Sequence, residues 1–217
     1  MIVLGLTGSI GMGKSTAAGR LRRMGVPLFD ADHAVHRLLA AGGAAAAEVA
    51  AAFPGVIAPS GGIDRAALGR RVFGDREALA RLERILHPKV EAEERRFIKA
   101  ARARRARIVV LDIPLLFEVG GESRCDYVLV MSASPLLQRQ RVMRREGMTE
   151  GRFAAILRQQ MPDREKRRRA DFVVQSGLSR ALTWRRLRAI LRLLLAKGGD
   201  GHARSGARYR NDRPRPR

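Results

Sequence analysis

The residues best suited to chemistry lie in a glycine-rich segment near the N-terminus, GLTGSIGMGKST at positions 5–16. Within it, GSIGMGKS matches the pattern G-x-x-x-x-G-K-S/T in full. Glycines let the backbone turn so that successive N–H groups point at one phosphate, and a following helix adds the positive end of its dipole. In this pattern the lysine neutralises the β- and γ-phosphates and the hydroxyl binds Mg²⁺. We therefore expect ATP to be bound by Gly8, Gly11, Met12, Gly13, Lys14, Ser15 and Thr16.

The alternative for this segment is a flexible glycine turn. An apolar run at 2–6 precedes it and a helical pattern at 15–24 follows, and this strand–loop–helix context favours the phosphate site. A second apolar run, IVVLD, ends in Asp112, which would bring a carboxylate to the same edge of a parallel sheet. We expect Ser15 and Asp112 to hold Mg²⁺; the alternative for Asp112 is an aspartate that caps a turn after a strand.

Two carboxylates, Asp30 and Asp32, follow another apolar run at 26–29. In a parallel sheet this strand ends at the edge that carries the phosphate loop, where a carboxylate can accept the proton of an attacking hydroxyl. Aspartate is also a preferred helix N-cap, so capping explains one of the two. The second would remain available for chemistry.

Five short apolar runs alternate with helical patterns and predict an α/β fold, a five-stranded parallel sheet flanked by helices. The strands are expected at 2–6, 26–29, 108–111, 127–131 and 172–174. Helices are expected at 15–24, 31–42, 44–53, 66–73, 77–86, 88–106, 136–146, 150–160, 164–170 and 178–195. Pro88 is expected to begin a helix, because its missing N–H costs nothing there.

The spacing of these runs predicts one P-loop NTPase domain at 1–196 with two additions. Its core would comprise 1–31, 107–138 and 171–196. The stretch 32–106 is too long for one crossover and is expected to be an inserted helical subdomain. The basic helical stretch 139–170 is a candidate lid. The Gly-, Arg- and Pro-rich stretch 197–217 has few apolar residues and is expected to be a disordered basic tail.

The composition limits the cellular setting and the class of partner. The 217 residues, 46% of them hydrophobic, are enough for one domain with a sizeable core. The formal net charge of +22 indicates an anionic partner. The single cysteine, Cys125, excludes an internal disulfide and fits a reducing compartment. We find neither a signal peptide nor an apolar stretch of about 20 residues, and expect a cytoplasmic protein without membrane contact.

Taken together, the motifs resemble those of the dephospho-CoA kinase family over nearly all of the chain except the tail. The P-loop alone is shared with many NTPases, whereas DAD, LHP and PLLFE in this order are more specific. The motifs that carry the resemblance are GLTGSIGMGKST at 5–16, DAD at 30–32, GIDRAALGRRVF at 62–73, ILHPKV at 85–90, DIPLLFE at 112–118, QRQRVMRREGMT at 138–149, and QM with KRRRADFVV between 160 and 174.

This resemblance implies transfer of the ATP γ-phosphoryl group to the ribose 3′-hydroxyl of dephospho-CoA, giving CoA and ADP. It implies that Asp32 is the general base, with Lys14 and Arg141 as the other catalytic residues. It also implies that Arg141 and Arg145 belong to a lid that binds ATP, and their spacing of four places them on one helix face. The inserted subdomain would bind the acceptor together with a nearby loop, through Asp30, Arg65, His87, Pro114, Leu115, Leu116 and Glu118.

Simpler structural roles stay open for several of these residues. Arg65 follows Asp64, a good helix cap, and His87 stands before Pro88 where it would cap a helix. The apolar residues of PLLFE are suited to the core, which leaves Glu118 as the more favoured polar contact. The basic helices are suited to a solvated face. Ser176 stands where the family often has asparagine, a departure that weakens the case for a nucleotide contact there.

Two other functions compete with this interpretation. The first is another P-loop kinase for a nucleotide or a small hydroxyl acid, against which DAD and LHP argue. The second is a nucleic-acid-binding NTPase, suggested by the net charge. The aromatic content of 5% and the lack of a base-stacking motif argue against it, so we expect no functional nucleic-acid binding.

Overall fold

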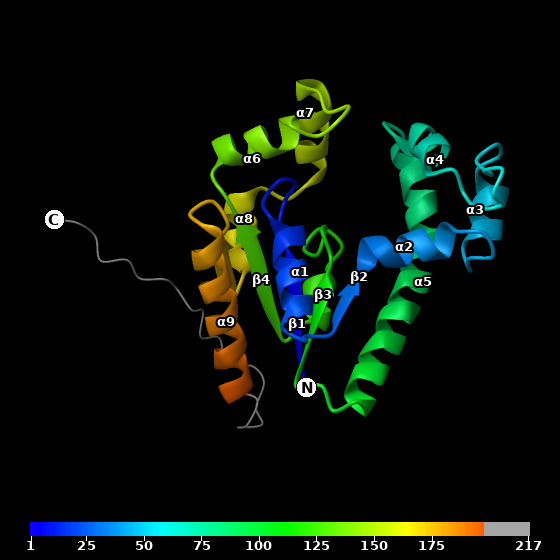
Figure 1. Cartoon of the computed structure of the whole chain (residues 1–217). Coiled ribbons are helices and arrows are strands. Elements are labelled where there is room, and N and C mark those ends of the chain that lie inside the picture. The colour runs from blue at the N-terminus through cyan, green and yellow to red at the C-terminus, as the bar shows by residue number, and fades with distance from the viewer. Residues whose placement is uncertain (198–217) are drawn as a thin grey trace. The chain divides into compact units, whose positions relative to one another are not determined.

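A computed structural model describes residues 1–197, and the expected tail at 198–217 lies outside the described residues. The chain divides into two compact units (Figure 1). The first comprises Met1–Phe29 and the chain from Ala101 onwards, and the second comprises Asp30–Ala100. No helix within 1–197 is both long enough and apolar enough to span a bilayer.

The first unit is built on a five-stranded parallel sheet, which confirms the expected fold class. The strand order is β2-β3-β1-β4-β5, so the central strand β1 is followed in sequence by an edge strand. In register, Leu4 of β1 lies opposite Val110 of β3 and Tyr127 of β4. The strands are β1 (Ile2–Thr7), β2 (Leu28–Asp30), β3 (Ile108–Asp112), β4 (Tyr127–Ser132) and β5 (Phe172–Gln175).

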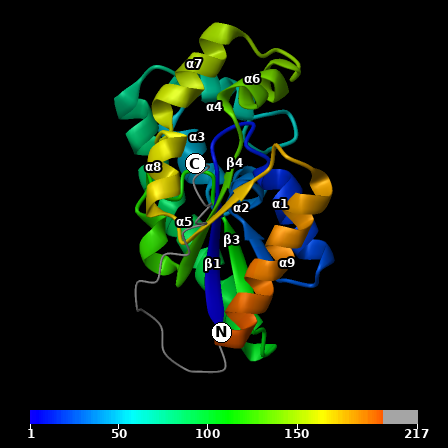
Figure 2. The same ribbon diagram turned by 90° about the vertical axis from the view of Figure 1, so that its left-hand side faces the viewer.

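Helices cover both faces of this sheet, as the continuous apolar strands require. Helices α1 and α9 contact each other on one face, and α8 packs against β4 on the other (Figure 2). Alternate strand residues such as Leu4 and Leu6 point to the α1–α9 face and are fully buried there. The helices of this unit are α1 (Lys14–Arg23), η1 (Gly121–Arg124), α6 (Pro135–Met143), α7 (Glu150–Gln159), α8 (Asp163–Arg169) and α9 (Arg180–Lys197).

The second unit is helical and has a hydrophobic core of its own. It contains α2 (Ala31–Leu39), α3 (Ala46–Ala52), α4 (Arg65–Val72) and most of α5 (Arg76–Ala103). Its core is formed by buried residues from all four helices and the segments between them: Leu38, Leu39, Ala45, Ala46, Val49, Phe53, Val56, Ile63, Leu68, Leu82, Ile85 and Leu86.

The expectation that Pro88 begins a new helix is wrong. Helix α5 (Arg76–Ala103) runs through it without a break. A proline inside a helix removes one hydrogen bond and crowds the preceding turn, at a cost of about 3 kcal/mol. Leu86 before the proline is buried in the core of the second unit, and Val90 after it packs against the same cluster. The apolar face therefore continues across Pro88, and its packing outweighs the local cost.

Candidate active site

The glycine-rich segment forms the loop between β1 and α1. Gly11 and Gly13 have φ angles of 77° and 89°, in the left-handed region that favours glycine. A Cβ at Gly11 would also lie 2.7 Å from Val142 Cγ2, and one at Gly13 would lie 2.9 Å from Ser176 Oγ. Among residues 1–197 no side chain caps the start of α1. Its first backbone N–H groups are therefore oriented for an anion at the positive end of the helix.

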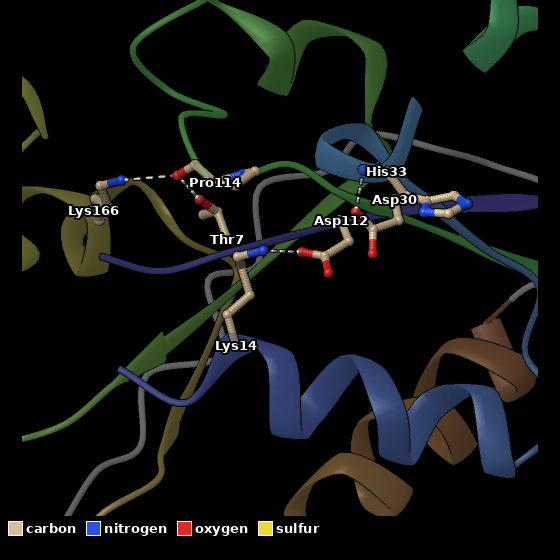
Figure 3. A network of polar contacts seen from close by, with 7 residues as sticks. All are labelled: Thr7, Lys14, Asp30, His33, Asp112, Pro114 and Lys166. Carbon is tan, nitrogen blue, oxygen red and sulfur yellow. Dashed lines mark hydrogen bonds and ion pairs between the residues drawn. The ribbon is translucent and has the colours of Figure 1, made fainter. Parts of the chain in front are cut away.

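A buried ion pair lies next to this loop. Lys14 Nζ is 2.7 Å from Asp112 Oδ1, and the two side chains are only 15% and 4% exposed (Figure 3). Lys14 is the first residue of α1 and Asp112 is the last residue of β3, so both come from the carboxyl end of neighbouring parallel strands. The next two residues of α1, Ser15 and Thr16, are exposed. The loop and the end of β3 thus present an ammonium, hydroxyls and a carboxylate at the edge where ligands bind in open parallel sheets.

Two glutamines hold the peptide groups of Ile10 within the loop. Gln138 Nε2 donates a hydrogen bond of 2.8 Å to the Ile10 carbonyl. Gln160 Oε1 accepts one of 3.0 Å from the Ile10 N–H. Gln138 belongs to α6, and Gln160 follows the last residue of α7. Neither glutamine was a predicted site residue, because nothing in a local pattern shows which distant backbone group an amide contacts.

Arg141 and Ser176 form a second set of contacts with the loop. Arg141 Nη1 donates to Ser176 Oγ at 2.8 Å and to the Gly11 carbonyl at 3.2 Å, and its Nη2 donates to the Ser176 carbonyl at 2.9 Å. Ser176 Oγ in turn donates to the Met12 carbonyl at 2.8 Å. The Met12 side chain is buried, and its sulfur accepts from the Ala133 N–H. Ser176 therefore links the arginine to the loop.

The expectation that Arg141 and Arg145 share a helix face is wrong. Helix α6 ends at Met143, and the chain then turns towards Gly147, which has a φ of 67°. Arg145 therefore lies beyond the helix and is exposed. Of these two arginines, within the described residues, Arg141 is the one with a hydrogen bond to the loop. The glycine four residues after Met143 was a signal for this helix end that the sequence analysis did not use.

The carboxylates of the DAD stretch differ in their local structure. Asp30 is the N-cap of α2, because its Oδ1 accepts a hydrogen bond of 3.0 Å from the His33 N–H (Figure 3). Asp32 lies in the first turn of α2 and is exposed. The expectation that one of the two caps a helix is confirmed. Asp32 is left with a solvent-facing carboxylate near the positive end of a helix.

The second unit also holds Arg65 and His87. Arg65 begins α4, which Asp64 caps by accepting from the N–H groups of Ala66 and Ala67. Arg65 Nη1 also lies 3.2 Å from His36 Nδ1. His87 is exposed and lies inside α5, so its alternative role as a helix cap is wrong.

The loop after β3 is largely internal to the first unit. Leu116 is fully buried and Phe117 is 5% exposed, which confirms that part of PLLFE packs in the core. Glu118 Oε1 accepts from the Met161 N–H at 2.7 Å and pairs with Lys166 Nζ at 2.8 Å. Leu115 and Pro114 are partly exposed. The loop therefore contributes more of its polar groups to internal contacts than the sequence analysis assumed.

Asp163, the first residue of α8, is a half-buried carboxyl three residues before Lys166. Burial raises the pKa of the Asp163 carboxyl above its ordinary value of 3.8, although a hydrogen bond from Ser132 and the charges of Arg167 and Lys166 act in the opposite direction. Its Oδ2 accepts from Ser132 Oγ at 2.8 Å, whereas its buried Oδ1 has no partner among residues 1–197. A carboxyl with a raised pKa opposes folding when it is ionised, and this penalty disappears below the pKa of the unfolded chain.

We therefore expect Asp163→Asn to raise Tm near neutral pH. The amide oxygen can still accept from Ser132, and the buried charge is gone. The gain over the wild type should shrink as the pH falls towards about 4, where the wild-type carboxyl is also neutral. Thermal unfolding of both proteins over this pH range checks the prediction. A gain in Tm that does not change with pH would contradict it.

Comparisons with known proteins identify the family of this chain. The family model described as dephospho-CoA kinase matches residues 2–180. A protein of Paramagnetospirillum magneticum named dephospho-CoA kinase is 62% identical over 167 residues, which cover 77% of this chain and 78% of the relative. One of Rhodospirillum rubrum with the same name is 53% identical over 207 residues, covering 95% of this chain and 97% of the relative.

A solved structure agrees as well. The crystal structure of a Thermus thermophilus protein is 39% identical in sequence, with a TM-score of 0.76, and the match covers 89% of this chain and 97% of the other. The matched residues 2–180 include the glycine-rich loop, the DAD stretch and the whole of the second unit. The chain therefore belongs to the dephospho-CoA kinase family.

Proposed function

We propose that the chain transfers the γ-phosphoryl group of ATP to the ribose 3′-hydroxyl of dephospho-CoA, giving CoA and ADP. Membership in the family supports this reaction. The single observation that carries it is the Lys14–Asp112 pair beside the uncapped start of α1, within residues 1–197. Phosphoryl transfer requires positioning and charge stabilisation more than covalent chemistry, and this loop offers both.

In this proposal the loop from Gly8 to Thr16 binds the phosphates of ATP. Backbone N–H groups at the start of α1 and the Lys14 ammonium neutralise the β- and γ-phosphates. Arg141 adds a second cation at the loop, supported by its hydrogen bonds to Gly11 and Ser176. Arg145 would bind the phosphates as part of a lid, residues 139–170, that closes over them.

Asp32 would act as the general base towards the ribose hydroxyl. Its carboxylate is exposed, and Asp30 beside it is already engaged as the cap of α2. The acceptor itself would bind to the insertion at 32–106 and to the loop after β3. The acceptor contacts proposed there are Asp30, Arg65, His87, Pro114, Leu115 and Glu118; the expected contact by Leu116 is not retained, because this side chain is fully buried.

Ser15 and Asp112 fit a Mg²⁺ ion that accompanies ATP. Hydroxyl and carboxylate oxygens are the ligands that Mg²⁺ prefers, and at nucleotide sites it needs few protein ligands because phosphates and water supply the rest. When bound through Ser15 and Asp112, Mg²⁺ would supply positive charge that offsets the negative charge developing during transfer. Residues 1–197 contain no cluster of three or more His, Cys, Asp or Glu able to hold a metal without such help.

Arg141→Ala should lower kcat more than it weakens ADP binding. Charge that develops between donor and acceptor is stabilised most in the transition state, and Arg141 lies at the loop that holds the donor. The exposed neighbour Arg144 gives the control Arg144→Ala, which should change neither quantity. Steady-state kinetics and ADP titration measure the two effects. Equal losses in kcat and in ADP affinity would make Arg141 a ground-state phosphate ligand instead.

The direct test of the proposed function is a product assay. The protein is incubated with ATP, Mg²⁺ and dephospho-CoA, and CoA is identified by mass. AMP, UMP, CMP and shikimate serve as competing acceptors, and the proposal fails if one of them is phosphorylated faster than dephospho-CoA. Added RNA should leave ATP turnover unchanged. We expect the enzyme in the cytoplasm, where its single cysteine stays reduced.

A further inference from the structure

Lys166 is a lysine with no exposed side-chain surface, a rare state for this residue type. It belongs to α8, within the run KRRR that otherwise points to solvent. Removing an ammonium from water destabilises the folded state unless close partners compensate for the lost hydration. A buried apolar side chain would fill the same space without that cost, so the contacts of Lys166 require an explanation.

The ammonium of Lys166 contacts the loop after β3 at two points. Its Nζ lies 2.8 Å from Glu118 Oε1 and donates at 3.4 Å to the Pro114 carbonyl. The same carbonyl accepts a second hydrogen bond of 2.9 Å from Thr7 Oγ1, and Thr7 is fully buried (Figure 3). Thr7 is the last residue of β1 and directly precedes Gly8 of the phosphate loop. The Pro114 carbonyl is therefore held from β1 and from α8 at once.

The loop from Ile113 to Glu118 depends on such contacts because it contains no regular helix or strand. Pro114 has no N–H to donate, so its carbonyl is the one backbone group by which hydrogen bonds can hold this residue. Asp112, the partner of Lys14, stands two residues earlier. The segment that contacts the loop also contacts the phosphate loop, since Gln160 beside Met161 binds the Ile10 N–H.

We propose that Lys166 is a positioning residue that sets the conformation of the Ile113–Glu118 loop for the acceptor. The inference rests on the proposed function, in which this loop contacts dephospho-CoA. Through Glu118 and the Pro114 carbonyl, Lys166 attaches α8 and the loop to each other, and Thr7 attaches both to the end of β1. ATP is held by the neighbouring phosphate loop, so loss of Lys166 affects the acceptor more than the nucleotide.

The test separates positioning from simple charge compensation. Lys166→Met should raise KM for dephospho-CoA about tenfold or more and change ADP affinity less than about threefold, while lowering Tm because Glu118 loses its buried partner. The double variant Lys166→Met/Glu118→Gln removes that uncompensated charge. It should recover part of the lost Tm but keep the raised KM, whereas Glu118→Gln alone, which leaves the lysine at the Pro114 carbonyl, should raise KM less. Arg168→Met, on an exposed residue of the same helix, is the control and should match the wild type.

A second variant removes the other hydrogen bond to the Pro114 carbonyl, the one from Thr7. Thr7→Val has nearly the shape of threonine but cannot donate to Pro114, so it should also raise KM for dephospho-CoA with little change in ADP affinity. Hydrogen exchange of the amides from Leu115 to Gly121 should quicken in Lys166→Met and in the double variant, with or without substrate. This readout does not depend on turnover. A wild-type enzyme inactive on dephospho-CoA would refute the proposed function alone.

Two outcomes would overturn the role of Lys166. The first is a double variant that recovers both Tm and the wild-type KM, which would make Lys166 only a charge partner of Glu118. The second is an unchanged KM and unchanged amide exchange in Lys166→Met. If neither lysine variant folds, a wild-type KM in Thr7→Val overturns the proposal instead.

Discussion

Replacing Asp32 with asparagine should lower kcat by about 10²–10⁴-fold, the usual contribution of a general base. A ribose hydroxyl is a weak nucleophile at neutral pH and has to lose its proton as it attacks phosphorus. Asp32 is exposed in the first turn of α2, so the nearly isosteric amide should leave Tm and ADP affinity unchanged. Because phosphoryl transfer has a loose transition state, the base acts in large part by orienting the hydroxyl, and some activity should remain.

Asp30→Asn is the matched control for this prediction. Asparagine is as good an N-cap as aspartate, so the hydrogen bond to the His33 N–H can persist and kcat should fall much less than in Asp32→Asn. If Asp30→Asn lost activity and Asp32→Asn kept it, the roles of the two carboxylates would be reversed. Full activity in both variants would mean that the DAD stretch only begins helix α2 and contributes nothing to catalysis.

Lys14→Met should lower kcat/KM by about 10²–10³-fold, the scale measured when one preorganised charge-stabilising donor is removed. The variant loses the only charge that the loop itself carries between Gly8 and Thr16, while methionine keeps most of the side-chain volume. It also takes the ammonium away from Asp112, which is 4% exposed, so Tm should fall as well. Steady-state kinetics and thermal unfolding measure the two effects.

A fall in Tm alone cannot account for a loss of this size if the assay is run well below Tm. Lys99→Met removes an exposed lysine from α5 and should leave both quantities at their wild-type values. A Lys14→Met enzyme with kcat/KM within tenfold of the wild type would show that the loop does not hold the reacting phosphates as proposed.

The sequence predicted the sheet and the phosphate loop because both depend on local patterns. Continuous apolar runs of strand length, such as those ending in Thr7 and Asp112, are typical of strands buried on both faces in a parallel sheet. Gly11 and Gly13 have left-handed φ angles, which favour glycine. Asp64 was correctly recognised as a cap, and one cap was correctly expected at Asp30 or Asp32, since capping involves only the next three residues.

The errors and omissions concern interactions that local patterns do not contain. Pro88 is a helix breaker by propensity, but the core on both sides of it overrides that preference. Gln160 and Ser176 contact residues of the phosphate loop that lie 150 and 164 positions earlier in the sequence. Lys166 contacts Pro114, which lies 52 positions earlier. A glutamine, a serine or a lysine in a basic helix has many solvated roles, so its type alone does not reveal such a contact.

The separation in sequence between the phosphate loop and the residues that hold it has a consequence for synthesis on the ribosome. The chain makes the complete glycine pattern first, whereas Gln138, Arg141, Gln160 and Ser176 all emerge after β4 has been made. A nascent chain that has just completed β3 already carries Lys14 and Asp112 but none of these four side chains. We therefore expect competence to bind nucleotide to be acquired late in translation, when β5 and Ser176 have left the exit tunnel.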